Sequence, residues 1–353
     1  MALLAMMIAR FMVTVAVIGS VTIYFYFYIL KDKSPWQPGK QPYLAWDYAN
    51  RRKVLILKEP GARVSIIGQI FNQHPGVFYM NEPLYPFEMF RTLNYTKRGE
   101  YNGQVRAFLD NVFHCRFYGY DDYLTFFSHP GLTDPRYRLS SRSLSSPPLC
   151  YSHMENFTSL AAYSANCPIL VPRWISRVCA REPHAVVSIA SKRAPGGGLT
   201  GLIPLITSEA LSVIHVVTDP RMRVWEGSLD KDTSVSFHDY AQKECAEVER
   251  ELNASLSLRA RDNTHYHVLK YEDFIHNVSS AAPEVIRVVD LHYLPEVRDW
   301  VQVKSGDWVE AESKRHGVPV DEWRVKMSDD QLAATERFCA FSLRKLGYKF
   351  GRS

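Results

Sequence analysis

The sequence lacks the features of several large classes of protein. It has no basic tract and no finger motif, and 42 basic against 37 acidic residues leave a formal net charge of only +5. This balance does not indicate nucleic-acid binding, although it suits an anionic ligand. There is no internal repeat and no low-complexity tract. With 46% hydrophobic residues in 353, the chain can form a sizeable core, so it is not expected to be disordered.

Motifs for a bound metal and for a nucleotide loop are also incomplete. Zinc spacing is absent among the histidines at positions 74, 184, 215 and 267. His215, within a strand-like run, is typical of a hydrogen-bonded core residue. The glycine-rich stretch 194–201 has no following Lys-Ser or Lys-Thr pair, so we interpret it as a flexible connection. Asp230-Lys231-Asp232 matches the Asp-x-Asp metal motif of Golgi glycosyltransferases, but no apolar strand end precedes it.

Residues 11–30 form twenty uncharged and mainly apolar positions, enough to span a bilayer as a helix. A cleaved signal peptide is the competing interpretation, but the run is long for one and no small-residue cleavage pattern follows it. The sequence therefore favours an uncleaved signal anchor, with residues 1–10 in the cytosol. Residues 31–52 contain several prolines among polar residues and are predicted to be a stem, and 53–353 to be one lumenal domain.

Features after the apolar run support this lumenal placement. Sequons for N-glycosylation occur at Asn94, Asn156, Asn253 and Asn277. All six cysteines also lie after the run, where an oxidising compartment would allow disulfides, although buried free thiols are the alternative. The prediction is a single-pass type II membrane protein whose large domain lies in the secretory lumen.

Short apolar runs rich in β-branched residues alternate with helical patterns. Strands are predicted at 53–57, 76–80, 184–190, 212–219 and 266–274. A helix at 237–252 places Phe237, Ala241, Cys245, Val248 and Leu252 on one face. The alternation predicts an α/β fold with a central parallel sheet covered on both faces, in which ligands bind at the carboxyl ends of the strands.

Two further segments have distinct patterns. Ser328 and Gln331 form a capping box for a last helix that is expected to end at Gly347. Residues 101–180 are rich in Tyr, Ser, Pro and Cys and fit the alternation poorly. We predict that they form a loop-rich insertion braced by disulfides, which could cover a substrate groove.

Four segments, in the expected order, resemble the Golgi membrane-anchored carbohydrate sulfotransferases, especially the branch that acts on the 6-hydroxyl of GlcNAc, Gal or GalNAc. They are GQIFNQHPGVFYMNEPLY at 68–85, VIHVVTDPR at 213–221, KYEDF at 270–274 and EWRVKMSDDQLAATERFCAFSLRKLGY at 322–348. The resemblance implies a three-layer fold like that of nucleotide kinases. It also implies a Golgi membrane location and transfer of a sulfuryl group from 3′-phosphoadenosine 5′-phosphosulfate (PAPS) to a glycan or glycosaminoglycan hydroxyl, without a metal.

The resemblance also assigns a catalytic residue and a phosphosulfate loop. Glu82 falls where the family keeps a glutamate expected to act as general base, if burial raises its pKa toward neutrality. The family loop reads roughly Arg-x-Gly-Ser-Ser, which places its Arg on Gly61, its Gly on Arg63 and its last Ser on Ser65. Only Ser65 matches. A shift of one or two residues would let Gly61 make the turn, with Lys58 or Arg63 supplying positive charge.

The 3′-phosphate segment is altered in a similar way. The first Arg of the family's R-D-P-R falls on Thr218, and the downstream Ser falls on Glu226, with Ser228 two places later. Arg221 is retained. The turns near Ser65 and Arg221 are expected to hold opposite ends of one nucleotide.

The C-terminal match adds further expectations. Trp323 and Arg324 match a W-R pair that would touch the nucleotide, the alternative being a core Trp with a solvated Arg. Cys245 and Cys339 match positions where a bridge between two late helices is expected. The leading hypothesis is sulfation of a glycan hydroxyl. A non-catalytic relative that binds glycan or a partner enzyme, and a Golgi glycosyltransferase, are the alternatives.

Overall fold

The computed structural model describes residues 51–60, 65–93, 99–154, 157–229, 235–261, 266–316 and 321–352, with the backbone alone at 65, 260–261 and 311–316. The predicted anchor at 11–30 and nearly all of the predicted stem lie outside these ranges. Within them, no helix combines the length and the apolar character needed to cross a membrane.

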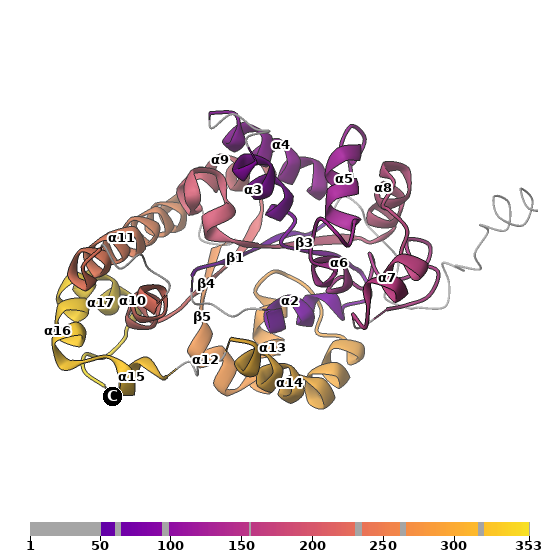
Figure 1. Cartoon of the computed structure of the whole chain (residues 1–353). Coiled ribbons are helices and arrows are strands. Elements are labelled where there is room, and N and C mark those ends of the chain that lie inside the picture. The colour runs from indigo at the N-terminus through magenta and orange to yellow at the C-terminus, as the bar shows by residue number, and fades with distance from the viewer. Residues whose placement is uncertain are drawn as a thin grey trace, which may run out of the picture. The chain divides into compact units, whose positions relative to one another are not determined.

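Five parallel strands form one sheet in the order β2-β3-β1-β4-β5 (Figure 1). The strands are β1 (Lys53–Lys58), β2 (Val77–Asn81), β3 (His184–Ala190), β4 (Ser212–Val217) and β5 (Tyr266–Lys270). Since β2 and β3 lie on one side of β1 while β4 and β5 lie on the other, the winding reverses between β1 and β4. Open parallel sheets bind ligands at the carboxyl ends of the strands at such a point.

Helices cover both faces of the sheet, as the sequence predicts. In β1, Leu55 and Leu57 face one apolar cluster, and Val54 and Ile56 face the other. The first cluster is completed by α3 (Tyr85–Thr92), α4 (Tyr101–Phe113), α5 (Asp121–Ser128), α8 (Pro172–Arg181) and α9 (Leu199–Glu209). The second is completed by α2 (Ser65–Asn72), α12 (Tyr271–His276), α13 (Val278–Arg287) and α14 (Pro295–His316).

A further group of helices packs around α11 (Phe237–Arg261). It comprises α10 (Pro220–Leu229), α15 (Trp323–Lys326), α16 (Asp329–Phe338) and α17 (Ala340–Leu346). The predicted apolar face of α11 is buried from Ala241 to Leu252 and half-buried at Phe237, and Cys245 on this face is bonded to Cys339, as the resemblance implied. The capping box at Ser328 is also confirmed. However, two helices take the place of the single last helix that was expected, because the backbone leaves helical geometry at Cys339.

Two predicted segments differ from the structure. The strand predicted at 266–274 ends at Lys270, where α12 begins with Glu272 and Asp273 in its first turn, a place that favours acidic side chains. The region 101–180 contains helices as well as loops, including α6 (Pro135–Leu139) and α7 (Leu160–Asn166). Helix α4 was missed although its apolar side is fully buried in the core. Short 3₁₀ turns, η3 (Ser191–Arg193) and η4 (Pro195–Gly197), follow β3.

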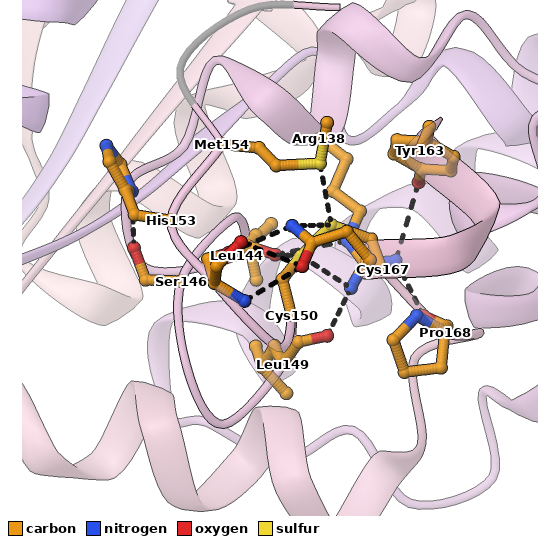
Figure 2. Close-up of a disulfide and its surroundings, with 12 residues drawn as sticks. Arg138, Leu144, Ser146, Leu149, Cys150, His153, Met154, Tyr163, Cys167 and Pro168 are labelled. Carbon is orange, nitrogen blue, oxygen red and sulfur yellow. Dashed lines mark hydrogen bonds between the residues drawn. A yellow bond between two sulfur atoms is a disulfide. The ribbon is translucent and has the colours of Figure 1, made fainter. Parts of the chain in front are cut away.

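The disulfide bracing of this region is confirmed. Cys115 is bonded to Cys179, and Cys150 to Cys167, the bond shown in Figure 2. With Cys245–Cys339, all six cysteines are paired, so the alternative of buried free thiols is wrong.

Candidate active site

The ends of β1, β3 and β2 bring two cations and one carboxylate together. Lys58 is the last residue of β1, Arg193 lies in the turn after β3, and Glu82 follows β2 directly. These strands are neighbours in the sheet and run parallel, so their ends meet at one edge. The edge is therefore the candidate active site.

The backbone holds Glu82 in an unusual conformation. Its φ of 50° is in the left-handed region, which residues other than glycine rarely adopt. Its N–H donates to the carbonyl of Ser188 at 2.7 Å, and its Oε2 accepts from the N–H of Ala190 at 3.2 Å. Both partners belong to β3, so the neighbouring strand fixes this conformation. Strain of about 1–3 kcal/mol held in this way is typical of functional positions.

Two cations flank the buried carboxylate of Glu82. Lys58 Nζ pairs with Oε1, and Arg193 Nη1 lies 2.6 Å from Oε2. Burial is the largest single influence and acts to raise the pKa of Glu82, but Lys58 and Arg193 together outweigh it, so the pKa lies below its ordinary value. This reverses the premise drawn from the sequence, that burial alone would bring the pKa toward neutrality.

Aromatic rings from two elements lie beside Arg193. Its guanidinium is 5.3 Å from the ring centre of Tyr85, and the ring of Tyr137 is 5.0 Å from that of Tyr85. Arg193 Nε also pairs with Glu88 at 2.5 Å. Tyr137 belongs to α6, so the predicted insertion at 101–180 contributes a side chain next to the candidate site.

The turns after β1 and β4 leave the sheet side by side. Lys58 is in register with Val216, and the Thr218 hydroxyl donates to the carbonyl of Pro60 at 3.2 Å. The expected phosphosulfate residues Gly61 and Arg63 lie outside the described residues. Ser65 is the first residue of α2, and only its backbone is described. The two turns are thus adjacent, while the loop chemistry at 61–64 stays a prediction.

A buried carboxylate that the sequence analysis missed lies at the start of this loop. Glu59 Oε1 accepts from His215 Nε2 at 2.7 Å, and Oε2 contacts Arg223 Nη1 at 3.0 Å. Burial acts to raise the pKa of Glu59, but the contacts to His215 and Arg223 outweigh it and the pKa is lowered. Arg223 also pairs with Glu244 at 2.9 Å. The only signal in the sequence was a glutamate directly after a strand. His215 is a satisfied core residue, as predicted.

A cavity of about 460 Å³ lies at the ends of β4 and β5. Its volume is that of a small-molecule site. Among the residues that line it are Arg221, Lys270, Glu272, Trp323, Arg324 and Arg352. The structure thus brings together two predicted cofactor residues, Arg221 and Arg324. Arg324 is partly exposed and pairs with Asp321 at 2.9 Å, and Lys270 lies 3.9 Å from exposed Asp273.

Arg221 differs from the other cations of the cavity because its guanidinium is 1% exposed and held within the protein. Nη2 and Nη1 lie 2.7 Å from Asp219 and from Glu336. The guanidinium also lies 4.4 Å from the ring centre of Trp323, which is a core residue. This arrangement links α10, which follows β4, to the C-terminal helices. It leaves few of the N–H groups of Arg221 available to bind a ligand.

The side chain of Ser228, the last predicted cofactor residue, forms its hydrogen bond within its own helix. Its hydroxyl donates to the carbonyl of Trp225 at 2.7 Å, and it does not line the cavity.

One group of possible metal ligands exists among the described residues, at the opposite edge of the sheet. Asp110, His114 and Glu209 place their ligand atoms within 4.8 Å of one another. The ammonium of Lys53 lies between them, 2.6 Å from Glu209 and 3.1 Å from His114. A cation of the protein itself therefore neutralises this cluster.

Comparisons with known proteins find carbohydrate sulfotransferases among the related sequences. The chain is 25% identical over 334 residues to carbohydrate sulfotransferase 3 of Homo sapiens, covering 86% of this chain and 68% of that protein. It is 25% identical over 342 residues to carbohydrate sulfotransferase 1 of Danio rerio, covering 87% and 80%. These relatives support membership of the carbohydrate sulfotransferase family, as a divergent member. No family model matches it.

The membership confirms the resemblance on which the site residues were assigned. Among solved structures, a sulfotransferase domain from the curacin biosynthetic pathway is 14% identical over 85% of this chain and 99% of that one, with a TM-score of 0.42. That similarity is too low for a comparison of sites. The central parallel sheet expected of a carbohydrate sulfotransferase is seen directly in this chain.

Proposed function

We propose that the chain transfers a sulfuryl group from PAPS to a hydroxyl of a glycan or glycosaminoglycan, with the 6-hydroxyl as the favoured position. The proposal depends on one observation above all. A strained, buried carboxylate, Glu82, lies at the carboxyl edge of the sheet between Lys58 and Arg193, in a chain of the carbohydrate sulfotransferase family.

The chemistry requires a base for the acceptor and positive charge for the leaving oxygen. PAPS supplies the sulfuryl group and a phosphate leaving group when it is bound. Glu82 is the group at this edge that can take the proton of the acceptor hydroxyl. Lys58 ends β1, next to the turn where the phosphosulfate end would lie, and an ammonium there stabilises negative charge. A contact of Lys58 with the donor would also relieve Glu82 of one cation and so strengthen it as a base.

The fit to a nucleotide is partial. In this proposal Thr218, at the adjacent turn, and Arg324, which lines the cavity, contact its 3′-phosphate end. The loop candidates Gly61, Arg63 and Ser65 complete the proposed site. Arg221 and Ser228 are proposed to support the site without contacting the nucleotide, because both side chains are bonded within the protein.

The proposed location is the Golgi membrane, with residues 11–30 as a type II anchor and the described residues in the lumen. Three disulfides suit an oxidising compartment. The sequon residues Asn253 and Asn277 are exposed.

One observation favours a second candidate function, a relative that binds glycan or a partner without catalysis. The two arginines that follow β4, Arg221 and Arg223, are neutralised by Asp219, Glu336, Glu59 and Glu244. Fewer cations then remain for a doubly charged nucleotide. The glycosyltransferase alternative rests on Asp230-Lys231-Asp232, which lies outside the described residues.

Two measurements separate these candidates. The purified full-length chain is titrated calorimetrically with PAPS and with its desulfated product, and transfer of labelled sulfate to glycan acceptors is assayed in parallel. Binding together with transfer supports the enzyme. No binding at millimolar nucleotide would leave the binding protein, and activity that needs a sugar nucleotide and manganese would identify a glycosyltransferase.

A further inference from the structure

Arg138 of α6 is a fully buried cation whose partners are neutral. Its side chain is 0% exposed. Nη1 donates to the carbonyl of Pro168 and Nη2 to that of Leu149, both at 2.7 Å, and Nε donates to the carbonyl of Leu144 at 3.1 Å (Figure 2). None of the ion pairs found among the described residues includes Arg138. Buried charges are nearly always paired with an opposite charge, so this cation lacks the partner that its environment favours.

The Tyr163 hydroxyl lies 3.4 Å from Arg138 Nη1, but burial raises its pKa and it stays neutral, so the other neighbouring group that could supply a negative charge is a disulfide sulfur. Arg138 Nη2 lies 3.6 Å from Cys150 Sγ, which is bonded to Cys167. A disulfide sulfur is neutral, but reduction would convert Cys150 to a thiol that can ionise. A guanidinium next to a cysteine stabilises its thiolate, and stabilisation of the reduced form makes a disulfide easier to reduce.

The surroundings of this disulfide can be compared with those of the other two. Its apolar cluster contains four buried residues, Leu139, Cys150, Tyr163 and Cys167, with Met154 against them. Cys115–Cys179 also has a guanidinium beside it, because Arg51 Nη2 lies 3.1 Å from Cys115 Sγ. Cys245 Sγ instead lies 3.8 Å from the carbonyl of Thr335, so Cys245–Cys339 serves as the reference disulfide.

We propose that Cys150–Cys167 is a thiol-exchange site that low-molecular-weight thiols open, with Cys150 retained as a thiolate against Arg138. With glutathione, the S–S bond breaks and two glutathione molecules are oxidised to one glutathione disulfide. Cys167 takes one of the two thiol protons, and the other is released to solvent because Cys150 stays ionised.

Opening this bond has a consequence for the candidate active site. The residues directly after α6 hold α2: the carbonyl of Ser140 accepts from Gln69 Nε2 at 2.9 Å, and the N–H of Arg142 donates to Asn72 Oδ1 at 2.7 Å. Helix α2 begins directly after the loop at 61–64. Reduction should therefore loosen α2, whatever ligand the loop holds.

The released proton provides the test. The full-length chain is equilibrated in glutathione buffers between pH 6.0 and 7.5, quenched with acid, alkylated, and analysed by mass spectrometry for each disulfide. The ratio of the reduced to the oxidised form of Cys150–Cys167 should rise about tenfold per pH unit. Cys245–Cys339, which yields two thiols, should not respond to pH in this range. No pH response at Cys150–Cys167 would overturn the proposal.

Variants separate the charge from the packing. Arg138→Met keeps much of the bulk and should abolish the pH response, whereas Arg136→Met, at an exposed arginine of the same helix, should preserve it. If Arg138→Met does not fold, Cys167→Ser provides the second measurement. The alkylation rate of Cys150 should then titrate below the ordinary thiol pKa of about 8.5. A midpoint at or above that value contradicts the proposal.

The effect on α2 is read by hydrogen exchange. After selective reduction, amides of residues 65–72 should exchange several-fold faster, while those of α11 should be unchanged. Equal exchange in α2 before and after reduction would refute the coupling. Neither readout depends on sulfuryl transfer, so failure here is distinct from failure of the proposed function.

Discussion

Arg193 Nη1 lies 2.6 Å from Glu82 Oε2, so the turn after β3 supplies a cation to the carboxylate that follows β2. Lys58 supplies a second cation from β1. A carboxylate between two cations is a weak base, because each cation stabilises its ionised form. Glu82 is therefore ionised at neutral pH. Its strength as a base should depend on the strength of its ion pair with each of the two cations.

Glu82→Gln should reduce turnover by about 10²–10⁴-fold, because the amide cannot accept the proton of the acceptor hydroxyl. Affinity for the desulfated nucleotide should change little, since the residue is assigned to the acceptor. Glu88→Gln is the matched control, because Glu88 also pairs with Arg193 but is partly exposed. Steady-state kinetics and calorimetry measure the two quantities. Equal losses of turnover and affinity in Glu82→Gln would contradict the base assignment.

Arg193→Met should move the acid limb of the pH profile of kcat/KM upward. In the native chain the lowered pKa of Glu82 places this limb below the ordinary carboxyl value of 4.5, so activity is lost only as the pH falls below that value. Without Arg193, Lys58 alone opposes the effect of burial, so the pKa of Glu82 should rise. The profile is measured with saturating donor. An unchanged limb in the variant would show that Glu82 is not the titrating base.

The strands could be predicted because their signal is local. Residues 184–190 are a mainly apolar run with three β-branched residues, and β3 has those bounds. The order of the strands was not predictable in this way, because no local pattern records that β3 inserts between β2 and β1. For this reason Glu82 was found by resemblance, whereas Arg193 was missed: its role requires the ends of β2 and β3 to be neighbours.

Buried charge was the other feature that the sequence did not reveal. Glu59 and Arg138 both lie in polar stretches that read as surface turns, yet both are buried. Their burial depends on partners distant in sequence, such as His215 for Glu59 and Pro168 for Arg138. Only the folded chain brings these partners together. The alterations in the phosphate motifs could be read directly from the sequence. The neutralisation of Arg221 and Arg223 by carboxylates could not.

Arg221→Met should destabilise the fold by about 3–5 kcal/mol, because it leaves Asp219 buried without its partner. Arg324→Ala, in the same cavity, should change stability by no more than about 0.5 kcal/mol, since its side chain is partly exposed. It should instead weaken binding of the desulfated nucleotide by about 10–100-fold if it contacts the phosphate. Urea unfolding and calorimetry test both. A stable Arg221→Met variant that no longer binds nucleotide would return Arg221 to the ligand site.

Two histidines at the amino edge of the sheet should each reduce stability as the pH falls from 7 to 5, whereas Glu182, whose pKa burial raises to about 7, contributes in the opposite direction. Burial lowers the pKa of His74 to about 4 and that of His184 to about 3. Each Nδ1 accepts a backbone N–H, from Gly76 in His74 and from Arg52 in His184, which requires an unprotonated nitrogen. The unfolded chain binds protons near pH 6.5, so acid favours unfolding until the folded-state pKa is reached.

The loss expected from the two histidines over this range is about 1–3 kcal/mol, most of it from His74, because His184 is partly exposed and water screens its charge. Urea midpoints at several pH values measure it. His74→Asn is the informative variant, since the amide oxygen can accept from Gly76 in place of Nδ1 but does not titrate. Between pH 6.5 and 5 its stability should fall less, or rise more, than that of the native chain. A variant with the same pH dependence as the native chain would place the acid-sensitive group elsewhere.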